Sequence, residues 1–295
     1  MKIRFGVGLG AGTEPDELPE LIDRLEASGV DSVWFSELVY SRAVDPFVGM
    51  AFTLARTTHL KVGTSVAVLP GRHPVLVAKQ LASLAALGPG RVLPVFGLQS
   101  AIPAEREVFA VPSGERAAVF DESLQLLRSV LQNDKADFSG RYFRVSAASV
   151  APRPLKPLDI WLGGSVPAAF RRIGRLGDGW LGSFLTPDEA RRGRELIRAA
   201  AVDAGREIEP DHFGISLAVA DGDVPPELAA AARQRRPDLE PSDLIAADWS
   251  ALHRRLDAYI AAGLSKFVIR PAGRGPTAAF VNRFVAELLP RQTGT

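Results

Sequence analysis

Residues 159–184 read DIWLGGSVPAAFRRIGRLGDGWLGSF, and this stretch decides the fold. An apolar run of strand length at 159–162 is followed by an amphipathic stretch that opens on a proline at 167–176, and then by a second apolar run at 179–184. Two such runs joined by a helix predict a right-handed β–α–β crossover between parallel strands. Both runs are apolar at successive positions, which is typical of strands buried on both faces of a parallel sheet.

The same alternation extends in both directions along the chain. Eight expected strands lie at residues 3–9, 32–36, 61–69, 91–97, 159–162, 179–184, 212–219 and 266–270. Expected helices lie at residues 16–28, 46–56, 74–87, 116–132, 167–176, 187–204, 249–262 and 277–289. Eight β–α units in 295 residues predict an α/β fold of the (β/α)8 TIM-barrel type, whose chemistry sits on the loops that follow the strands.

Three connections are longer than a barrel needs. They lie after strand four (98–115), before strand five (136–158, with an expected hairpin at 137–144) and after strand seven (220–248). Long loops on a barrel are candidate lids or partner surfaces. Because no low-complexity linker divides the sequence, we expect residues 1–295 to form a single domain.

Composition excludes several classes of function. The formal charge is +1, from 35 basic and 34 acidic residues, so no general field attracts nucleic acid or anionic lipid. The basic runs at 191–194 and 233–236 lack interleaved aromatic residues and are expected to be solvated faces. Cysteine is absent and the four histidines have no metal-ligand spacing, so no metal site is expected. No apolar run reaches the ~18 residues of a membrane span, and no signal peptide is visible, which favours a cytoplasmic protein.

A competing interpretation starts from residues 6–11, GVGLGA. They match the dinucleotide-binding fingerprint, with Glu37 after the next expected strand. In that fingerprint the glycines open the helix directly, whereas here residues 13–16 intervene. A doubly wound nucleotide-binding sheet is therefore the alternative to the barrel, and close packing with a tight exit turn is the structural explanation of the glycines.

Several longer stretches carry a resemblance to a known family. They are ASGVDSVWFSE (27–37), VGTSVAVLP with RHPV and AKQ (62–80), LGPGRV (87–92), SGRYF (139–143), IWLGGS (160–165) and RLGDGWL (175–181). In this order, over residues 5–271, the chain resembles the bacterial luciferase-like monooxygenases. The resemblance implies a flavin-type ring over the C-terminal mouth of a barrel, with substrate above it. Actinobacterial branches of the family commonly use coenzyme F-420, a deazaflavin, and other members use FMN.

Residue chemistry and the resemblance together suggest a cofactor site after strands three and five. Gly163, Gly164 and Ser165 lie before an expected helix, where a ligand can approach the backbone and an anion can meet free N–H groups. The alternative is a simple turn with Ser165 as the helix cap. For Ser65 and Val66 the resemblance implies a bulge that supports the ring, often with a cis peptide bond. Without the resemblance, Ser65 and Val66 would be interpreted as ordinary core residues of a strand.

Further cofactor contacts are expected after strands four, six and eight. The family pattern places Gly97 and Gln99 in the pocket, and an amide can donate to a ring carbonyl and accept from a ring N–H. A solvated loop is the alternative for Gln99. The resemblance places Ser183 near the cofactor phosphate. Arg270 suits an acidic cofactor tail, because guanidinium pairs bidentately with phosphate and carboxylate, with a surface ion pair as its alternative.

The expected catalytic residues are Glu37 and His73. Many family members carry a His after the Glu as the acid or base beside the ring, but here Leu38 occupies that place. Glu37 could titrate in a raised range if desolvated, or form a structural ion pair with Arg42. His73 is the histidine expected nearest the mouth, with a partly exposed loop position as its alternative.

The expected function is that of an oxidoreductase that transfers a hydride between coenzyme F-420 and a small organic substrate. An FMN-dependent monooxygenase on the same scaffold is one alternative. A deazaflavin-binding protein without turnover is another, motivated by Leu38. The partner is a small molecule, with no nucleic acid and no membrane, and the resemblance adds a homodimer.

Overall fold

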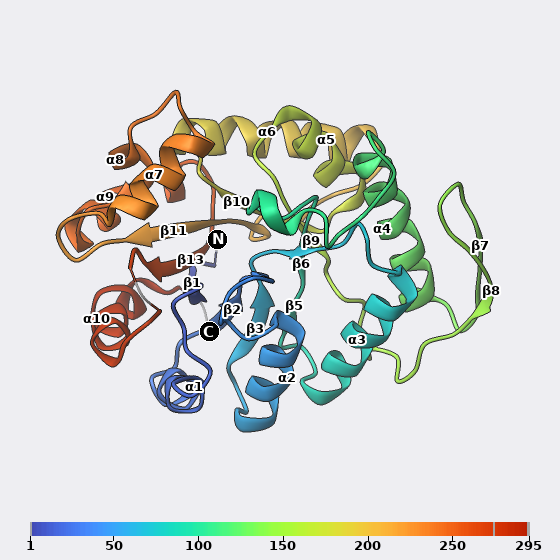
Figure 1. Ribbon diagram of the computed structural model, residues 1–295, viewed down its shortest axis with the longest axis horizontal. Coiled ribbons are helices and arrows are strands. Elements are labelled where there is room, and N and C mark those ends of the chain that lie inside the picture. The colour runs from blue at the N-terminus through green and yellow to red at the C-terminus, as the bar shows by residue number, and fades with distance from the viewer. Residues whose placement is uncertain (1, 274, 294–295) are drawn as a thin grey trace.

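Eight parallel strands form a closed barrel in the computed structural model, which describes residues 2–273 and 275–293 (Figure 1). Two of the eight are interrupted: the third consists of β3 and β4, and the fourth of β5 and β6. The strands in chain order are β1 (Arg4–Leu9), β2 (Ser32–Phe35), β3 (Lys61–Thr64), β4 (Ala67–Val68), β5 (Val92–Leu93), β6 (Val95–Gly97), β9 (Trp161–Gly163), β10 (Gly179–Ser183), β11 (Phe213–Val219) and β13 (Lys266–Pro271).

The pairing register shows how the barrel closes. β1 pairs with both β2 and β13, which joins the first strand to the last. β3 pairs with β5 and β4 pairs with β6, so the two interrupted strands lie side by side along their length. β6 continues to β9, β10, β11 and back to β13. The prediction of a (β/α)8 barrel is confirmed, and the doubly wound alternative is wrong because the sheet has no open edges.

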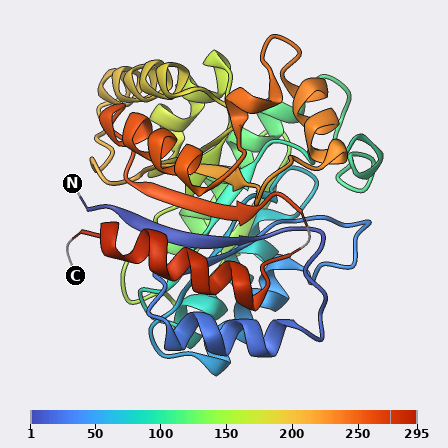
Figure 2. The same ribbon diagram turned by 90° about the vertical axis from the view of Figure 1, so that its left-hand side faces the viewer.

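A ring of helices covers the outside of the barrel (Figures 1 and 2). Short polar side chains fix where several begin: Asp45 accepts hydrogen bonds from two N–H groups of α2, and Thr186 forms a capping box with Glu189 at α6. The helices of this ring are α1 (Leu18–Ala27), α2 (Pro46–Arg56), α3 (Pro74–Leu87), α4 (Arg116–Gln132), α5 (Pro167–Leu176), α6 (Pro187–Asp203), α9 (Trp249–Ala261) and α10 (Ala278–Leu288).

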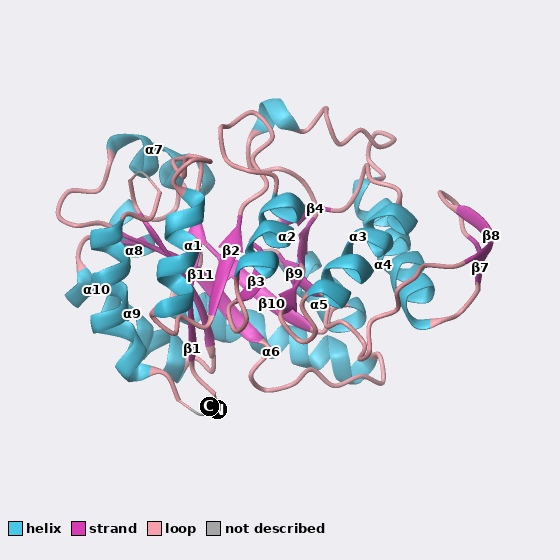
Figure 3. Cartoon of the chain, turned by 90° about the horizontal axis from the view of Figure 1, so that it is seen from below, coloured by secondary structure: helices cyan, strands magenta, loops and turns pink. Residues whose placement is uncertain are grey.

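The three insertions contain more structure than the sequence indicated. The segment after β6 holds a short 3-10 helix, η1 (Pro103–Glu105). The expected hairpin is present as β7 (Ala136–Ser139) and β8 (Arg144–Ala148), which project from one side in Figure 1. The segment after β11 was expected as a loop but forms α7 (Pro226–Arg235), α8 (Pro241–Leu244) and β12 (Ile245–Ala246). In Figure 3 both chain ends lie at one end of the molecule and α7 at the other.

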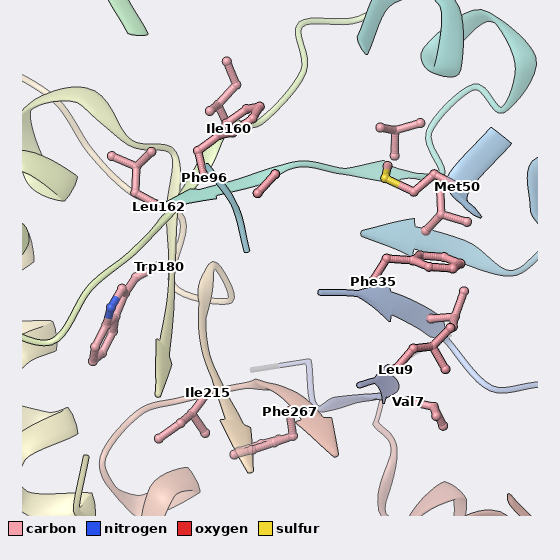
Figure 4. Packing of buried hydrophobic residues seen from close by; sticks show 14 of the residues in the cluster. Val7, Leu9, Phe35, Met50, Phe96, Ile160, Leu162, Trp180, Ile215 and Phe267 are labelled. Carbon is pink, nitrogen blue, oxygen red and sulfur yellow. The ribbon is translucent and has the colours of Figure 1, made fainter. Parts of the chain in front are cut away.

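The buried apolar residues form three clusters, of which two lie on opposite sides of the strands and the third joins β11 and β12 to α7 and α8. Most buried apolar residues pack between barrel and helices, as Figure 4 shows for Phe35, Met50 and Phe96 around the strands. A smaller cluster inside the barrel contains Trp34. A Cβ atom at Gly6 would lie 2.5 Å from the Trp34 Nε1 atom, so the first strand needs glycine here to leave room for the indole. This close packing accounts for part of the GVGLGA sequence.

A cluster of charged side chains lies at the N-terminal end of the barrel. Asp31 has a side chain only 7% exposed, and Lys61 donates to it at 2.8 Å. Lys266 donates to the same carboxylate, and Arg4 lies 3.6 Å away. Against the cost of burial, the two lysines lower the pKa of Asp31 to about 2. The buried Lys266 ammonium also lies 5.8 Å from the centre of the Trp34 ring.

Candidate functional site

A cavity of about 480 Å³ opens at the carboxyl ends of the strands. Its wall is formed by the segments that follow β1, β2 and β6, by the interruption between β3 and β4, and by residues of β4, β10, β11, β12, β13, α7 and α8. In the part of the chain that the structure describes, no group of three or more His, Asp or Glu side chains could hold a metal ion. No helix among the described residues is long and apolar enough to cross a membrane.

Five of the expected cofactor residues line this one cavity: Ser65, Val66, Gln99, Ser183 and Arg270. They come from strands three, four, six and eight, so the barrel brings together positions spread over about 200 residues of sequence. The Ser65–Val66 peptide bond is cis, as the resemblance implied. The Gln99 side chain is exposed, and Ser183 is half-buried. The wall therefore offers an amide, hydroxyls, a guanidinium and an aliphatic surface to one ligand.

The other expected cofactor residues lie beside this wall. A Cβ at Gly97 would be 2.5 Å from the Val66 Cγ2 atom, and one at Gly163 would be 3.0 Å from its Cγ1 atom. These two glycines therefore leave the space that Val66 occupies. Gly164 has a φ of 145° and its carbonyl accepts a hydrogen bond from the indole of Trp180 at 2.9 Å. Ser165 is not the helix cap, because α5 begins after Val166.

Glu37 lies on the cavity wall with its side chain 3% exposed. One carboxylate oxygen accepts from the Val68 N–H at 2.7 Å, and the other is paired with the Arg72 guanidinium. Burial raises the pKa of Glu37, while Arg72 opposes this rise. The alternative partner Arg42 is wrong, since it pairs with Glu14 at 2.8 Å. Glu37 therefore holds β4 against the end of β2.

Arg72 is itself held from several sides. Its Nε donates to the Val68 carbonyl at 3.0 Å, and its guanidinium lies 5.6 and 5.4 Å from the ring centres of Phe47 and Phe109. These contacts hold the Glu37–Arg72 pair in place. The pair lies between the cavity and a second hollow of about 390 Å³, and Leu38 lines both. Leu38 lies where family members commonly carry a titratable His.

His73 occupies a different environment. It is exposed at the N-terminus of α3, where its Nδ1 atom accepts from the Val75 N–H at 3.3 Å. Its ring meets that of Phe143 edge-on at 5.7 Å. The residues that line the cavity do not include His73. Its position matches the alternative of an exposed loop histidine, with a capping contact added.

The sequence did not single out four polar residues of the cavity: Ser36, Ser100, Ser216 and Arg235. A single polar residue within an otherwise apolar strand could have indicated Ser216, which pairs with Ser183 across the sheet. Arg235 belongs to a basic run that was expected to be a solvated face. That expectation fits Arg233, which is 62% exposed, but not Arg236, whose side chain is 16% exposed.

Known proteins of similar sequence and structure identify the family of this chain. The model of the luciferase-like monooxygenase family matches residues 1–264. The chain belongs to this family. Uncharacterized proteins of Mycobacterium tuberculosis and Mycobacterium bovis are 35% identical to it over 163 residues, 55% of this chain. The chain spans about half the length of these curated relatives, since the match covers 56% of each.

Two further luciferase-like proteins match over nearly the whole chain. An F420-dependent glucose-6-phosphate dehydrogenase of Amycolatopsis mediterranei is 26% identical, with 97% of this chain and 98% of the relative covered. A solved structure of an F420-dependent secondary alcohol dehydrogenase, in complex with an F420–acetone adduct, superposes with a TM-score of 0.82. It covers 98% of both chains at 19% identity, so this likeness shows the luciferase-like barrel alone.

Proposed function

We propose that this chain is an oxidoreductase that transfers a hydride between coenzyme F-420 and a small organic substrate. One observation carries the proposal: Ser65, Val66, Gln99, Ser183 and Arg270 line a single cavity at the mouth of the barrel. The family membership and the F420-dependent relative of similar length support it. When bound, the deazaflavin would supply the carbon that gives or takes the hydride.

The residues present fit such a group. Val66, seated in the space left by Gly97 and Gly163, offers an aliphatic surface on which a planar ring can rest. The Gln99 amide can donate to a ring carbonyl and accept from a ring N–H. Ser183 and Arg270 supply a hydroxyl and a guanidinium suited to the acidic part of the cofactor.

Glu37 is the one acidic side chain among the described residues that line the cavity. We propose that it keeps the wall formed by β4 in place through Val68 and Arg72, rather than moving a proton to or from the substrate. His73 was predicted as an acid or base from its position on the loop after strand three, and because it does not line the cavity we assign it no catalytic role. Because Leu38 brings no titratable group to the mouth, a deazaflavin-binding protein without turnover is the second candidate.

Fluorescence titration with F-420 and, separately, with FMN tests the proposal. Saturable quenching with F-420 and none with FMN would support it, and saturation with FMN alone would favour the monooxygenase. Tight binding of F-420 without reduction or oxidation of it by alcohols, aldehydes and sugar phosphates would favour the binding protein. If neither compound saturates the protein, the proposed cofactor class is wrong.

We also propose that the chain forms a homodimer through the outer faces of α2 and α3. Val48, Leu76 and Leu87 lie on these two helices with 61%, 67% and 63% of their surface exposed. Exposed apolar side chains on neighbouring helices are candidates for a protein interface. Replacing Val48 and Leu76 by Glu should give a monomer in light scattering, whereas Leu155→Glu, at a position 91% exposed, should leave the mass unchanged. A monomeric unmodified protein would refute the dimer.

A further inference from the structure

The wall of the cavity carries a net positive charge. Three ionisable side chains line the cavity: Glu37, Arg235 and Arg270. Glu37 is neutralised by its pair with Arg72. Within residues 2–273 and 275–293, neither of the two arginines has a carboxylate partner or a hydrogen bond. The cavity thus carries two positive charges without counter-charges, and guanidinium groups remain protonated in proteins.

Arg270 projects from β13 into the barrel mouth. A Cβ at Gly8 would lie 3.3 Å from the Cβ of Arg270, so the glycine of the first strand leaves space beside it. In the sheet register, Arg270 lies opposite Ala218, and Ser183 lies opposite Ser216 on the neighbouring strand. Burial lowers the pKa of Arg270, which reflects a cation held away from water. Arg270 therefore has a small residue beside it on each neighbouring strand, Gly8 on β1 and Ala218 on β11.

Arg235 reaches the same cavity from the last residue of α7, and its neighbour Arg236 anchors this helix. Arg236 donates to the Phe184 carbonyl at 2.7 Å and pairs with Glu189 at 2.7 Å and with Asp238 at 2.7 Å. The guanidinium of Arg235 lies 5.1 Å from the centre of the Phe184 ring. Two consecutive arginines thus hold Phe184 by its backbone and by its ring, and α7 is docked with Arg235 over the cavity.

A like charge faces Arg235. Arg106, on the insertion after β6, is close enough to lower the pKa of Arg235, in addition to the effect of burial. Arg106 is itself held by a hydrogen bond from its Nε to the Ser100 carbonyl at 3.2 Å. Cations assembled without a carboxylate repel one another, and a bound anion removes that repulsion.

We propose that Arg235 and Arg270 bind the anionic group, a phosphate or carboxylate, of the substrate. This inference rests on the proposed function, and it reassigns Arg270 from the acidic part of the cofactor to the substrate, which leaves Gln99, Ser183 and the Val66 surface for the cofactor. Guanidinium forks recognise both groups bidentately. The wall around Arg235 is otherwise apolar, with Leu228, Leu244 and Ile245. The substrate class is therefore a small organic acid or phosphate ester whose carbon body packs on this apolar surface.

The test uses the F-420-loaded protein and inorganic phosphate as the probe, at constant ionic strength. Phosphate should bind saturably to the loaded protein, followed by its melting temperature and by the fluorescence of bound F-420. Arg235→Gln should weaken phosphate binding by about 10- to 100-fold, as expected for loss of hydrogen bonds to a charged group. It should change the affinity for F-420 by less than about two-fold.

Arg233→Gln is the matched control. It removes the same charge from the same helix, but Arg233 is 62% exposed and lies 3.9 Å from Glu240, outside the cavity. It should leave phosphate binding unchanged. Arg235→Lys, which keeps the charge but loses the fork, should fall between the two, and a circular dichroism melt of each variant verifies folding.

Three results would overturn the inference. One is the absence of saturable phosphate binding to the loaded protein, and another is equal binding by Arg235→Gln and Arg233→Gln. The third is phosphate that binds the F-420-free protein and is displaced when F-420 is added, which would assign the two arginines to the acidic part of the cofactor. Binding of F-420 is measured first, before any phosphate is added. If F-420 does not bind, the proposed function is wrong, and this result is distinguished from a failure of phosphate binding alone.

Discussion

Replacing Asp31 by Asn removes a buried negative charge from the closed end of the barrel while it keeps the shape of the side chain. Three cations surround this carboxylate: Lys61, Lys266 and Arg4. The fold lowers the pKa of Asp31 from 3.8 to about 2. A difference of about 1.8 pKa units corresponds to about 2.4 kcal/mol of preference for the charged form. We therefore expect the variant to lose roughly this much free energy of unfolding at pH 7.

The same shift fixes the pH dependence. Because the folded pKa is below the unfolded value, the contribution of Asp31 is fully present above about pH 5 and is lost as the pH falls toward 2. At pH 3 about half of it remains. The pKa of Lys266 is lowered as well, since burial lowers it more than Asp31 raises it. For a base, a lowered pKa disfavours the charged form in the folded protein, so its effect on stability is opposite to that of Asp31. In the variant this lysine can lose its proton, which keeps the cost near that of the carboxylate alone.

Thermal unfolding followed by far-ultraviolet circular dichroism measures the effect. With about 2.1 cal/mol/K of unfolding entropy per residue, a chain of 295 residues has roughly 0.6 kcal/mol/K, so the melting temperature should fall by about 4 °C at pH 7. Asp23→Asn, which breaks an exposed pair with Arg56, should shift it by less than about 1 °C. The reasoning is refuted if Asp31→Asn matches this control, or if its gap to the unmodified protein stays constant between pH 7 and pH 3.

Three more substitutions probe the mouth of the barrel. Gly97→Ala would place a Cβ 2.5 Å from the Val66 Cγ2 atom and displace this side chain. Fluorescence titration should then show F-420 binding weakened more than ten-fold. An unchanged affinity would show that Val66 does not contact the cofactor. Arg236→Met removes the anchor on the Phe184 carbonyl and should speed thermolysin cleavage within residues 221–245, and an unchanged cleavage pattern would contradict docking by this side chain. Glu37→Gln should lower turnover less than ten-fold with an unchanged pH profile, whereas a loss above 100-fold with a flattened profile would give Glu37 the proton-transfer role.

The fold was readable from the sequence because each β–α unit carries its own local signals. Apolar runs, a proline at the first helical turn and capping side chains such as Thr186 depend only on neighbouring residues. The segment at 220–248 also has prolines at the first turns of its helices, Pro226 and Pro241, but it lacks a run of apolar residues at helical spacing, and its helices were missed. α7 has little apolar periodicity and buries Ala232 alone among its residues, so its position depends on contacts from elsewhere in the chain.

The site was predictable where the barrel itself positions a residue. Ser65, Gln99 and Arg270 follow strands, and parallel strands bring their carboxyl ends to one rim. Arg235 could not be found in this way. Its place is set by Arg236, whose partner Glu189 lies 47 positions earlier on α6, and such a long-range pair leaves no local pattern. For the same reason the Glu37–Arg72 pair, 35 positions apart, was missed in favour of Arg42.

The cations at the two ends of the barrel differ in whether they have a carboxylate partner, and this difference separates structural from functional charge. At the closed end, Lys61 and Lys266 share one carboxylate, so the charges stabilise the fold and need no ligand. At the open end, Arg270 and Arg235 line a cavity without such a partner among the described residues. Arg270 is withdrawn from water without a counter-charge, which costs stability and is retained where a ligand supplies the missing anion, whereas Arg235 is exposed at the rim of the same cavity. The open end is therefore incomplete until an anionic molecule occupies it.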